Sequence, residues 1–250
     1  MKKPFDKNWN FSEGCVIAVD KPLGWTSTDV VRKIKYMLIK NGYKKLKIGH
    51  AGTLDPLASG VLLICTGRAT KQIETLQTGE KEYTAELRLG ATTASYDMEH
   101  PVNAEYPWEH ITRTDLEAAL VRLTGERLQM PPLYSAKKID GQRAYEYARE
   151  GEEVKLRAAQ INIYEIRLLE YELPRIKISV RCSKGTYIRS LAREIGEEVQ
   201  SGAYLTSLCR TRSGDYSIDD TYSMDEIISA LTPSVARSGN GNDNGPHSAA

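Results

Sequence analysis

Two strand-like segments, near residues 159–172 and 175–183, are separated only by a short stretch around Pro174. In the second segment, apolar residues from Ile176 to Cys182 alternate with polar ones, as expected for a strand with one buried face. Strands joined by so short a connection must be antiparallel, because a parallel pair needs a crossover of a dozen or more residues. The sequence therefore predicts a β-hairpin and a sheet with antiparallel pairs.

The rest of the chain alternates between strand patterns and helical patterns of apolar residues. Strands are predicted at 15–19, 61–65 and 83–89. Helices are predicted to begin near Ser27, to end at Gly125, to span about 142–149, and to run from Ile188 to Val199. Long strands joined by hairpins, with helices interspersed, indicate an α+β fold built on a mixed, mostly antiparallel sheet flanked by helices.

The 250 residues are 40% hydrophobic and 27% charged, which is ordinary for a globular protein. The last residues, from about 237 to 250, lack large apolar side chains and cannot contribute to a core. We expect an N-terminal extension at 1–14, one folded domain at 15–236 and a disordered polar tail at 237–250.

Several classes of protein are disfavoured by what the chain lacks. No apolar run approaches the roughly 20 residues that span a bilayer, and the N-terminus has no apolar stretch typical of a secretion signal. We therefore expect a cytoplasmic protein without membrane contact. The four cysteines are far apart and form no Cys-x-x-Cys pair, and no glycine-rich nucleotide motif occurs. Neither a metal nor a cofactor is expected.

The charges are unevenly distributed, although the net charge is only +1. Seven basic residues and no acidic ones lie between Arg32 and Lys47, and further basic clusters occur near Tyr134, Tyr145 and Tyr187. Such a run is often only the solvated face of a helix. Basic segments interleaved with tyrosines nevertheless favour a surface that binds phosphates and stacks on bases.

The glycine-punctuated segment from Gly49 to Gly60 carries one carboxylate, Asp55, directly before Pro56. An Asp-Pro pair is typical of a helix start, with Asp55 as N-cap and Pro56 at the first helical position. Alternatively, the glycines let a ligand approach closely and Asp55 is a catalytic carboxylate. The local pattern alone is compatible with both interpretations.

Six segments of the chain resemble, in order, those of the TruB-type tRNA pseudouridine synthases, bacterial enzymes that isomerise the uridine of the TΨC arm. The match covers roughly residues 15–231, and its most specific parts are the loop around Asp55 and the segment Lys184-Gly-Thr-Tyr-Ile-Arg189. The matching segments are 20–27, 49–71, 81–90, 131–136, 182–189 and 208–214. The resemblance implies the pseudouridine synthase fold, with the catalytic domain at 15–236.

The resemblance also implies a reaction and its residues. In this reaction, the C1′–N1 bond of uridine breaks and the base is rejoined through C5, with no cofactor or metal. By resemblance, Asp55 is the catalytic carboxylate and Arg189 its cationic partner. Tyr83 stacks against the uracil ring and helps to deliver or remove the C5 proton, and Tyr187 helps to position the catalytic group. Core packing is the structural alternative for Tyr83, and packing at a helix start for Tyr187.

The target uridine lies inside a folded loop, so the enzyme must flip it out of the stack. His50 matches the residue that fills the vacated place. Further residues are expected to bind substrate or RNA: Lys21, Pro22, Lys137, Lys138, Lys184 and Arg210.

The expected partner is tRNA, through its TΨC stem-loop, and we expect a monomer without an obligate protein partner. Many bacterial members continue into a PUA-type RNA-binding domain, and we expect no full one here, because a polar tail follows the catalytic domain. Two alternatives remain: a guide-RNA-dependent pseudouridylase with the same catalytic core, and a non-catalytic RNA-folding factor in which Asp55 only caps a helix.

Overall fold

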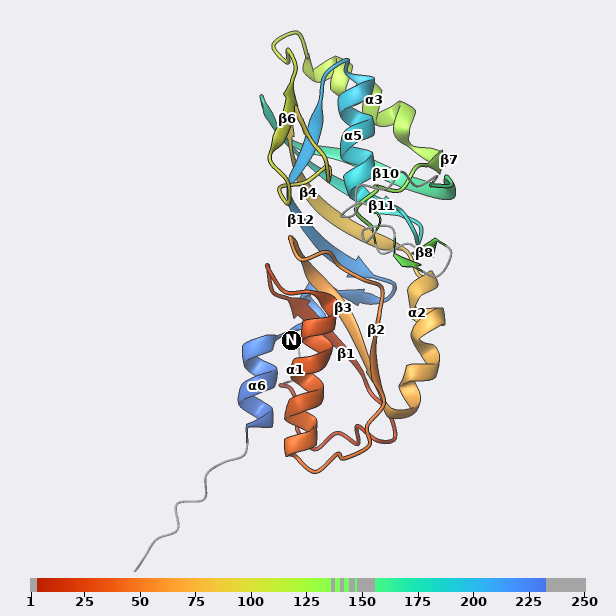
Figure 1. Cartoon of the computed structure of the whole chain (residues 1–250), viewed down its shortest axis with the longest axis vertical. Coiled ribbons are helices and arrows are strands. Elements are labelled where there is room, and N and C mark those ends of the chain that lie inside the picture. The colour runs from red at the N-terminus through yellow and green to blue at the C-terminus, as the bar shows by residue number, and fades with distance from the viewer. Residues whose placement is uncertain (1–3, 136–137, 140–141, 144–146, 148–155, 233–250) are drawn as a thin grey trace, which may run out of the picture.

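The computed structural model describes residues 4–135, 138–139, 142–143, 147 and 156–232. Within these residues, most strands belong to one long sheet that runs through the molecule (Figure 1). The strands of this sheet are β1 (Val16–Lys21), β2 (Ile48–Ala51), β3 (Ala58–Thr66), β4 (Lys81–Leu89), β7 (Gly125–Gln129), β10 (Ala159–Glu172), β11 (Arg175–Cys182), β12 (Ala203–Ser213), β13 (Tyr216–Ser217) and β14 (Tyr222–Ser223).

The sheet has the order β14-β1-β3-β12-β4-β11-β10-β7, while β2 pairs with β3 and β13 with β12. Neighbouring strands are antiparallel, except that β1 is parallel to β14 and β3 is parallel to β12. The predicted α+β fold with a mixed, mostly antiparallel sheet is therefore confirmed. Two small sheets stand apart, one of β5 (Ala91–Thr93) and β6 (Val102–Glu105), the other of β8 (Lys138–Ile139) and β9 (Gln142–Arg143).

The hairpin around Pro174 forms as the sequence predicts. Strands β10 and β11 are antiparallel, and Ile176, Ile178 and Val180 of β11 are buried in the core. The alternation of apolar and polar residues predicts this strand correctly, because every second side chain of a strand points to the same face of the sheet. The sequence predictions miss five strands of the long sheet, namely β2, β7, β12, β13 and β14. The most consequential of these is β12, which lies between β3 and β4 and joins the two halves of the sheet.

The helices are α1 (Ser27–Lys40), α2 (Ile73–Thr78), α3 (Arg113–Leu123), α5 (Ile188–Glu198) and α6 (Met224–Leu231), with short 3₁₀ segments at Gly67–Gln72 and Ile218–Asp220. A capping box starts α1, in which Thr26 and Asp29 each accept a hydrogen bond from the other's backbone N–H. Apolar side chains of α1 and α5, such as Ile34 and Ile195, enter one continuous core against the sheet. Helices α1 and α6 lie together at one end of the sheet, and α3 and α5 at the other (Figure 1).

The short helix predicted at 142–149 is wrong at its start, because Gln142–Arg143 pair as strand β9 with Lys138–Ile139. The pairing satisfies the backbone hydrogen bonds of these residues across a hairpin rather than within a helix. Residues 144–146 and 148–149 lie outside the described part of the chain. Among the described helices, none combines the length and the apolar character needed to cross a membrane.

Candidate active site

Asp55 lies in a loop of residues 52–57, here called the Asp55 loop, between the end of β2 and the start of β3. Its carbonyl accepts a hydrogen bond from the backbone N–H of Ala58 at 3.0 Å, which closes a turn. Strand β3 begins at Ala58, so no helix follows Pro56. The interpretation of Asp55 as a helix N-cap is therefore wrong, and its side chain is free of that backbone role.

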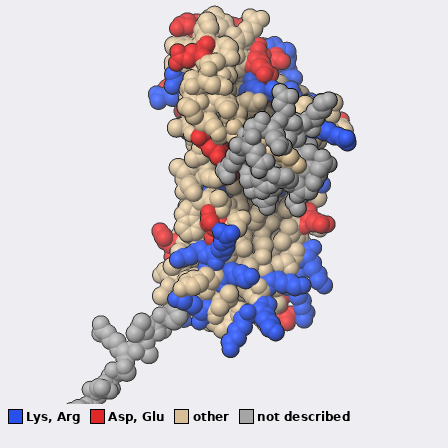
Figure 2. Space-filling view, viewed as in Figure 1, with Lys and Arg blue, Asp and Glu red and all other residues tan. Residues whose placement is uncertain are grey.

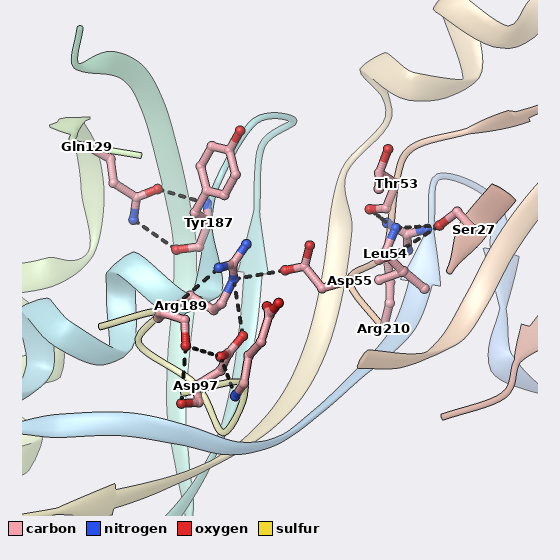
Figure 3. A network of polar contacts seen from close by, with 11 residues as sticks. Ser27, Thr53, Leu54, Asp55, Asp97, Gln129, Tyr187, Arg189 and Arg210 are labelled. Carbon is pink, nitrogen blue, oxygen red and sulfur yellow. Dashed lines mark hydrogen bonds and ion pairs between the residues drawn. The ribbon is translucent and has the colours of Figure 1, made fainter. Parts of the chain in front are cut away.

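The Asp55 loop is tied to the start of α1 by a buried serine. The Ser27 hydroxyl donates to the Leu54 carbonyl at 3.0 Å and accepts from the Leu54 N–H at 2.9 Å. These two bonds satisfy both backbone groups of the residue that precedes Asp55. The position of Asp55 is thus linked to the first turn of a well-capped helix (Figure 3).

Arg210 of β12 supports the loop from the other side. Its guanidinium is buried and donates to the carbonyls of Val61 at 2.7 Å, Gly52 at 3.1 Å and Thr53 at 3.4 Å. The backbone of β12 comes so close that a Cβ on Gly60, whose φ is +95°, would lie 2.3 Å from the Arg210 carbonyl oxygen. Arg210, expected from the sequence to bind RNA, is placed inside the protein, where its charge is engaged by loop carbonyls.

Lys21 has a similar position. Its side chain is fully buried, and its ammonium donates to the carbonyls of Trp25 at 2.6 Å, Pro22 at 2.8 Å and Pro56 at 3.4 Å. Burial lowers the pKa of Lys21 to about 8, although the nearby Asp55 carboxylate opposes the shift. The structure therefore places Lys21 beneath the Asp55 loop rather than on an exposed surface, and the half-buried Pro22 supplies one of its acceptors.

The carboxylate of Asp55 forms an ion pair with the guanidinium of Arg189 on α5. The distance from Arg189 Nε to Asp55 Oδ2 is 2.9 Å, and the exposed fractions of the two side chains are 5% and 40%. Figure 3 shows the two groups facing each other across the gap between the loop and α5. The arginine is thus withdrawn from water, while the carboxylate keeps access to a ligand. The pairing expected from the sequence is present in the structure.

Arg189 also contacts a second carboxylate, that of Asp97. Its Nε lies 3.7 Å from Asp97 Oδ2, and its Nη1 donates to the Ser95 carbonyl at 3.3 Å. Asp97 is buried and accepts hydrogen bonds from the Ser95 hydroxyl at 2.5 Å and from the Glu99 N–H at 2.9 Å. Sequence reasoning assigned no role to this segment, because an aspartate in a loop after a short strand carries no local signal for a partner about 90 residues away.

The start of α5 is held by the end of β7. The Gln129 side-chain carbonyl accepts from the Tyr187 N–H at 2.8 Å, and its amide donates to the Tyr187 carbonyl at 3.2 Å. The next residue after Gln129, Met130, accepts a hydrogen bond at its carbonyl from the Ser190 hydroxyl at 2.7 Å. Tyr187 itself precedes the first helical residue. The segment 129–130 therefore fixes the turn of α5 that carries both Tyr187 and Arg189.

A cavity of about 590 Å³ opens beside Asp55. Its lining includes both predicted tyrosines, both predicted charged partners and two lysines: Asp55, Tyr83, Lys81, Lys184, Tyr187 and Arg189. Burial raises the pKa values of Tyr83 and Tyr187 above the ordinary value of a phenol, so both hydroxyls stay protonated at neutral pH. A smaller, mostly apolar cavity of about 160 Å³ lies on another side of Asp55, against Leu23 and Met98.

The other predicted site residues are dispersed. His50 is half-buried in β2, where it pairs with Ile64 of β3, and is not part of the lining of either cavity beside Asp55. Lys137 and the side chain of Lys138 lie outside the described residues. In the described part of the chain, no three His, Cys, Asp or Glu side chains gather as metal ligands would.

Comparisons with a family model and with individual proteins indicate the same family. Residues 40–188 match the family model described as TruB family pseudouridylate synthase, N-terminal domain. The chain is 58% identical over 219 residues to a tRNA pseudouridine synthase B of Phocaeicola vulgatus, covering 87% of this chain and 93% of the relative. It is 45% identical to that of Chlorobaculum tepidum, covering 88% and 92% of the two chains.

Solved structures give the same architecture. A chain in a Cbf5–Nop10–Gar1 complex is 32% identical and superposes with a TM-score of 0.66, covering 86% of this chain and 53% of that one. A chain in an H/ACA RNP bound to a substrate RNA containing 2′-deoxyuridine is 29% identical, with a TM-score of 0.63 and coverages of 86% and 52%. This chain therefore spans about half the length of these two structural relatives.

Proposed function

This chain belongs to the TruB family of pseudouridylate synthases, and from that membership we propose that it isomerises the uridine of the TΨC loop of tRNA, with Asp55 as the catalytic carboxylate. It is an isomerase, since its relatives of 45–58% identity are tRNA pseudouridine synthases. The fold is that of the pseudouridine synthases, as the structural relatives have it.

The observation that carries the proposal is the Asp55–Arg189 pair at the edge of the larger cavity. Pseudouridine formation breaks the C1′–N1 bond, turns the base and joins C1′ to C5, after which the C5 proton leaves and N1 takes up a proton. The overall change is neither oxidation nor hydrolysis. A carboxylate beside the ribose can attack C1′ or remove the C2′ proton, and both steps need it ionised and held at a fixed distance. The Arg189 side chain is only 5% exposed, and its positive guanidinium favours the ionised carboxylate. The contact from Nε to Asp55 Oδ2, at 2.9 Å, also fixes the orientation of that carboxylate.

Arg189 must itself be held for this pairing to act as a fixed support. Asp97 lies near the same Nε that pairs with Asp55, and the Ser95 carbonyl accepts a hydrogen bond from Nη1. Asp97 thereby acts as a positioning residue, because its contact with the reacting atoms runs through Arg189. A preorganised charge of this kind stabilises a changing charge on the substrate without reorganisation during the reaction.

The tyrosines are suited to holding the base while it is detached from the ribose. Tyr83 lies on β4, is 8% exposed and lines the same cavity as Asp55. Burial raises its pKa, so a neutral phenol lies in the cavity, where it can stack on the uracil ring and help to deliver or remove the C5 proton. Tyr187 enters the cavity from the start of α5. To reach Asp55 the uridine leaves its stack in the folded loop, at a cost of about a few kcal/mol.

The experiment that tests this function supplies the purified chain with unmodified tRNA carrying 5-tritiated uridine, without any guide RNA. Release of tritium from the TΨC uridine is the expected result, since C5 exchanges its hydrogen for the new glycosidic bond. The same preparation with a guide RNA added separates the stand-alone enzyme from a guide-dependent pseudouridylase. Binding without any release in either arm would favour a non-catalytic RNA-folding factor.

A further inference from the structure

The outer face of α1 and the turn after it carry a set of cations that the fold does not use. The inner face of α1 places Val30, Ile34 and Leu38 in the core. The outer face and the turn expose five cations, here called the α1 basic face: Arg32, Lys35, Lys40, Lys44 and Lys45. Figure 2 shows Lys and Arg side chains gathered at this end of the molecule, where Figure 1 places α1.

The charges of the α1 basic face are not neutralised locally. Arg32 has an acidic neighbour, Asp29, at 3.8 Å, and in the described part of the chain none of the four lysines forms an ion pair. Seven cations without an acid between residues 32 and 47, in a chain of net charge +1, leave the remainder of the chain net acidic. Like charges so close together repel one another, so folding stability does not account for them.

An aromatic and an apolar side chain stand exposed among these lysines. Tyr36 is 51% exposed and Ile39 is 44% exposed, and the Lys40 ammonium lies 4.6 Å from the centre of the Tyr36 ring. Cations around an exposed aromatic ring are the combination with which proteins follow a nucleic-acid backbone. The chemistry of the surface therefore matches a polyanion with stacking groups rather than an acidic protein alone.

The position of the α1 basic face separates it from the active site. Helix α1 starts at Ser27, which is hydrogen-bonded to Leu54 beside Asp55. Fourteen residues at 1.5 Å each carry the helix about 20 Å away from that point, and the turn with Lys44 and Lys45 follows its far end. A phosphate bound there belongs to a part of the RNA distant from the reacting nucleotide.

We propose that the α1 basic face binds the phosphate backbone of tRNA outside the TΨC stem-loop, as a second contact that adds affinity for whole tRNA. This inference rests on the proposed function, because it takes the target uridine to lie at Asp55. Each phosphate contact releases counterions and contributes about 0.7–0.9 to the slope of log affinity against log salt. Three contacts therefore add about 2–3 to that slope.

The test compares whole tRNA with an isolated TΨC stem-loop, measured by filter binding over a range of salt. The variant Lys35→Gln/Lys44→Gln/Lys45→Gln removes three exposed charges. It keeps Lys40, because this cation in the last turn of α1 stabilises the helix C-terminus and lies over the Tyr36 ring. The matched control removes three exposed cations from other elements: Arg88→Gln/Arg113→Gln/Arg175→Gln. Thermal unfolding of both variants checks that each remains folded.

The expected result is a salt slope for whole tRNA that falls by about 2–3 in the lysine variant, with the stem-loop slope and the control variant unchanged. Equal losses on both RNAs would overturn the inference, because the face would then contact the arm itself. No loss on either RNA would overturn it as well. Failure of the proposed function is a different outcome, namely wild-type protein that binds tRNA but releases no tritium.

Discussion

Replacing Arg189 by Lys keeps the positive charge and removes the geometry with which that charge is applied. The guanidinium meets three groups at once, with Nε at 2.9 Å from Asp55 and 3.7 Å from Asp97, and Nη1 at 3.3 Å from the Ser95 carbonyl. A lysine offers one nitrogen on a flexible stem and cannot reproduce this fork. The ammonium is expected to remain with Asp97, which is 6% exposed, because an unpaired carboxylate costs most where water is excluded.

In Arg189→Lys, Asp55 therefore loses its directional contact, while the buried carboxylate of Asp97 keeps a cation beside it. A displacement of about 1 Å from the productive position costs roughly 100-fold in rate, or about 2.7 kcal/mol of activation free energy. We therefore expect the single-turnover rate of Arg189→Lys to fall about 100-fold, with RNA affinity close to that of the wild type. Saturating enzyme with 5-tritiated tRNA gives the rate, and filter binding gives the affinity.

Arg193→Lys is the matched control, since Arg193 lies on the same helix and pairs with Glu197 at 3.6 Å. It should leave the rate within about threefold of the wild type, because the ion pairs of Arg193 are with Glu194 and Glu197 rather than with Asp55, and a lysine keeps the charge. A rate for Arg189→Lys that equals the control would refute the reasoning, since charge alone would then suffice. A large loss of RNA affinity would contradict it too, by placing Arg189 in RNA binding.

Three further changes test the supports of the site. Arg210→Met should lower the free energy of unfolding by about 3–5 kcal/mol in urea titration, because it leaves the Gly52 carbonyl of the Asp55 loop and the Val61 carbonyl of β3 without their donor; an unchanged midpoint would contradict this. Gln129→Leu should reduce the single-turnover rate about tenfold by freeing the backbone of Tyr187, with little change in RNA affinity; an unchanged rate would mean that α5 holds its own start. Burial lowers the pKa of Lys81 to about 8 from 10.5, so the wild type should gain stability relative to Lys81→Met between those pH values, by up to about 3 kcal/mol, as the buried amine loses its proton; a constant difference would show that folding does not lower the pKa of Lys81.

The parts of the fold that the sequence predicts are those where the periodicity of apolar residues is strong. The hairpin around Pro174, the strand at 61–65 and the start of the helix at Ser27 all form as predicted. Strand β12 escapes this reasoning because polar and charged residues interrupt its apolar pattern between Leu205 and Ser213. Its place in the centre of the sheet is set by pairing with β3 and β4, which no local pattern contains.

The site residues also divide into those that the sequence predicts and those that it does not. Asp55, Arg189, Tyr83 and Tyr187 follow from motifs, and the structure brings all four to one cavity. Asp97 is absent from the prediction because its partner is distant in the sequence.

The charges of Lys21 and Arg210 do not by themselves indicate their locations. Both side chains are buried and hold backbone carbonyls, and Arg210 also lines the larger cavity. Whether a cation faces solvent or the backbone depends on how the strands pack around it. The alternation of buried and exposed side chains in a single strand does not determine that arrangement.

The most direct test of the central claim is the single-turnover release of tritium by Asp55→Asn. The amide has nearly the shape of the carboxylate but carries no charge, and can neither attack C1′ nor remove a proton effectively. Asp55 is 40% exposed and lies on a loop held by Ser27 and Arg210, so the variant should fold and bind tRNA as the wild type does. The account predicts retained binding with no detectable release of tritium, and release at the wild-type rate would contradict it.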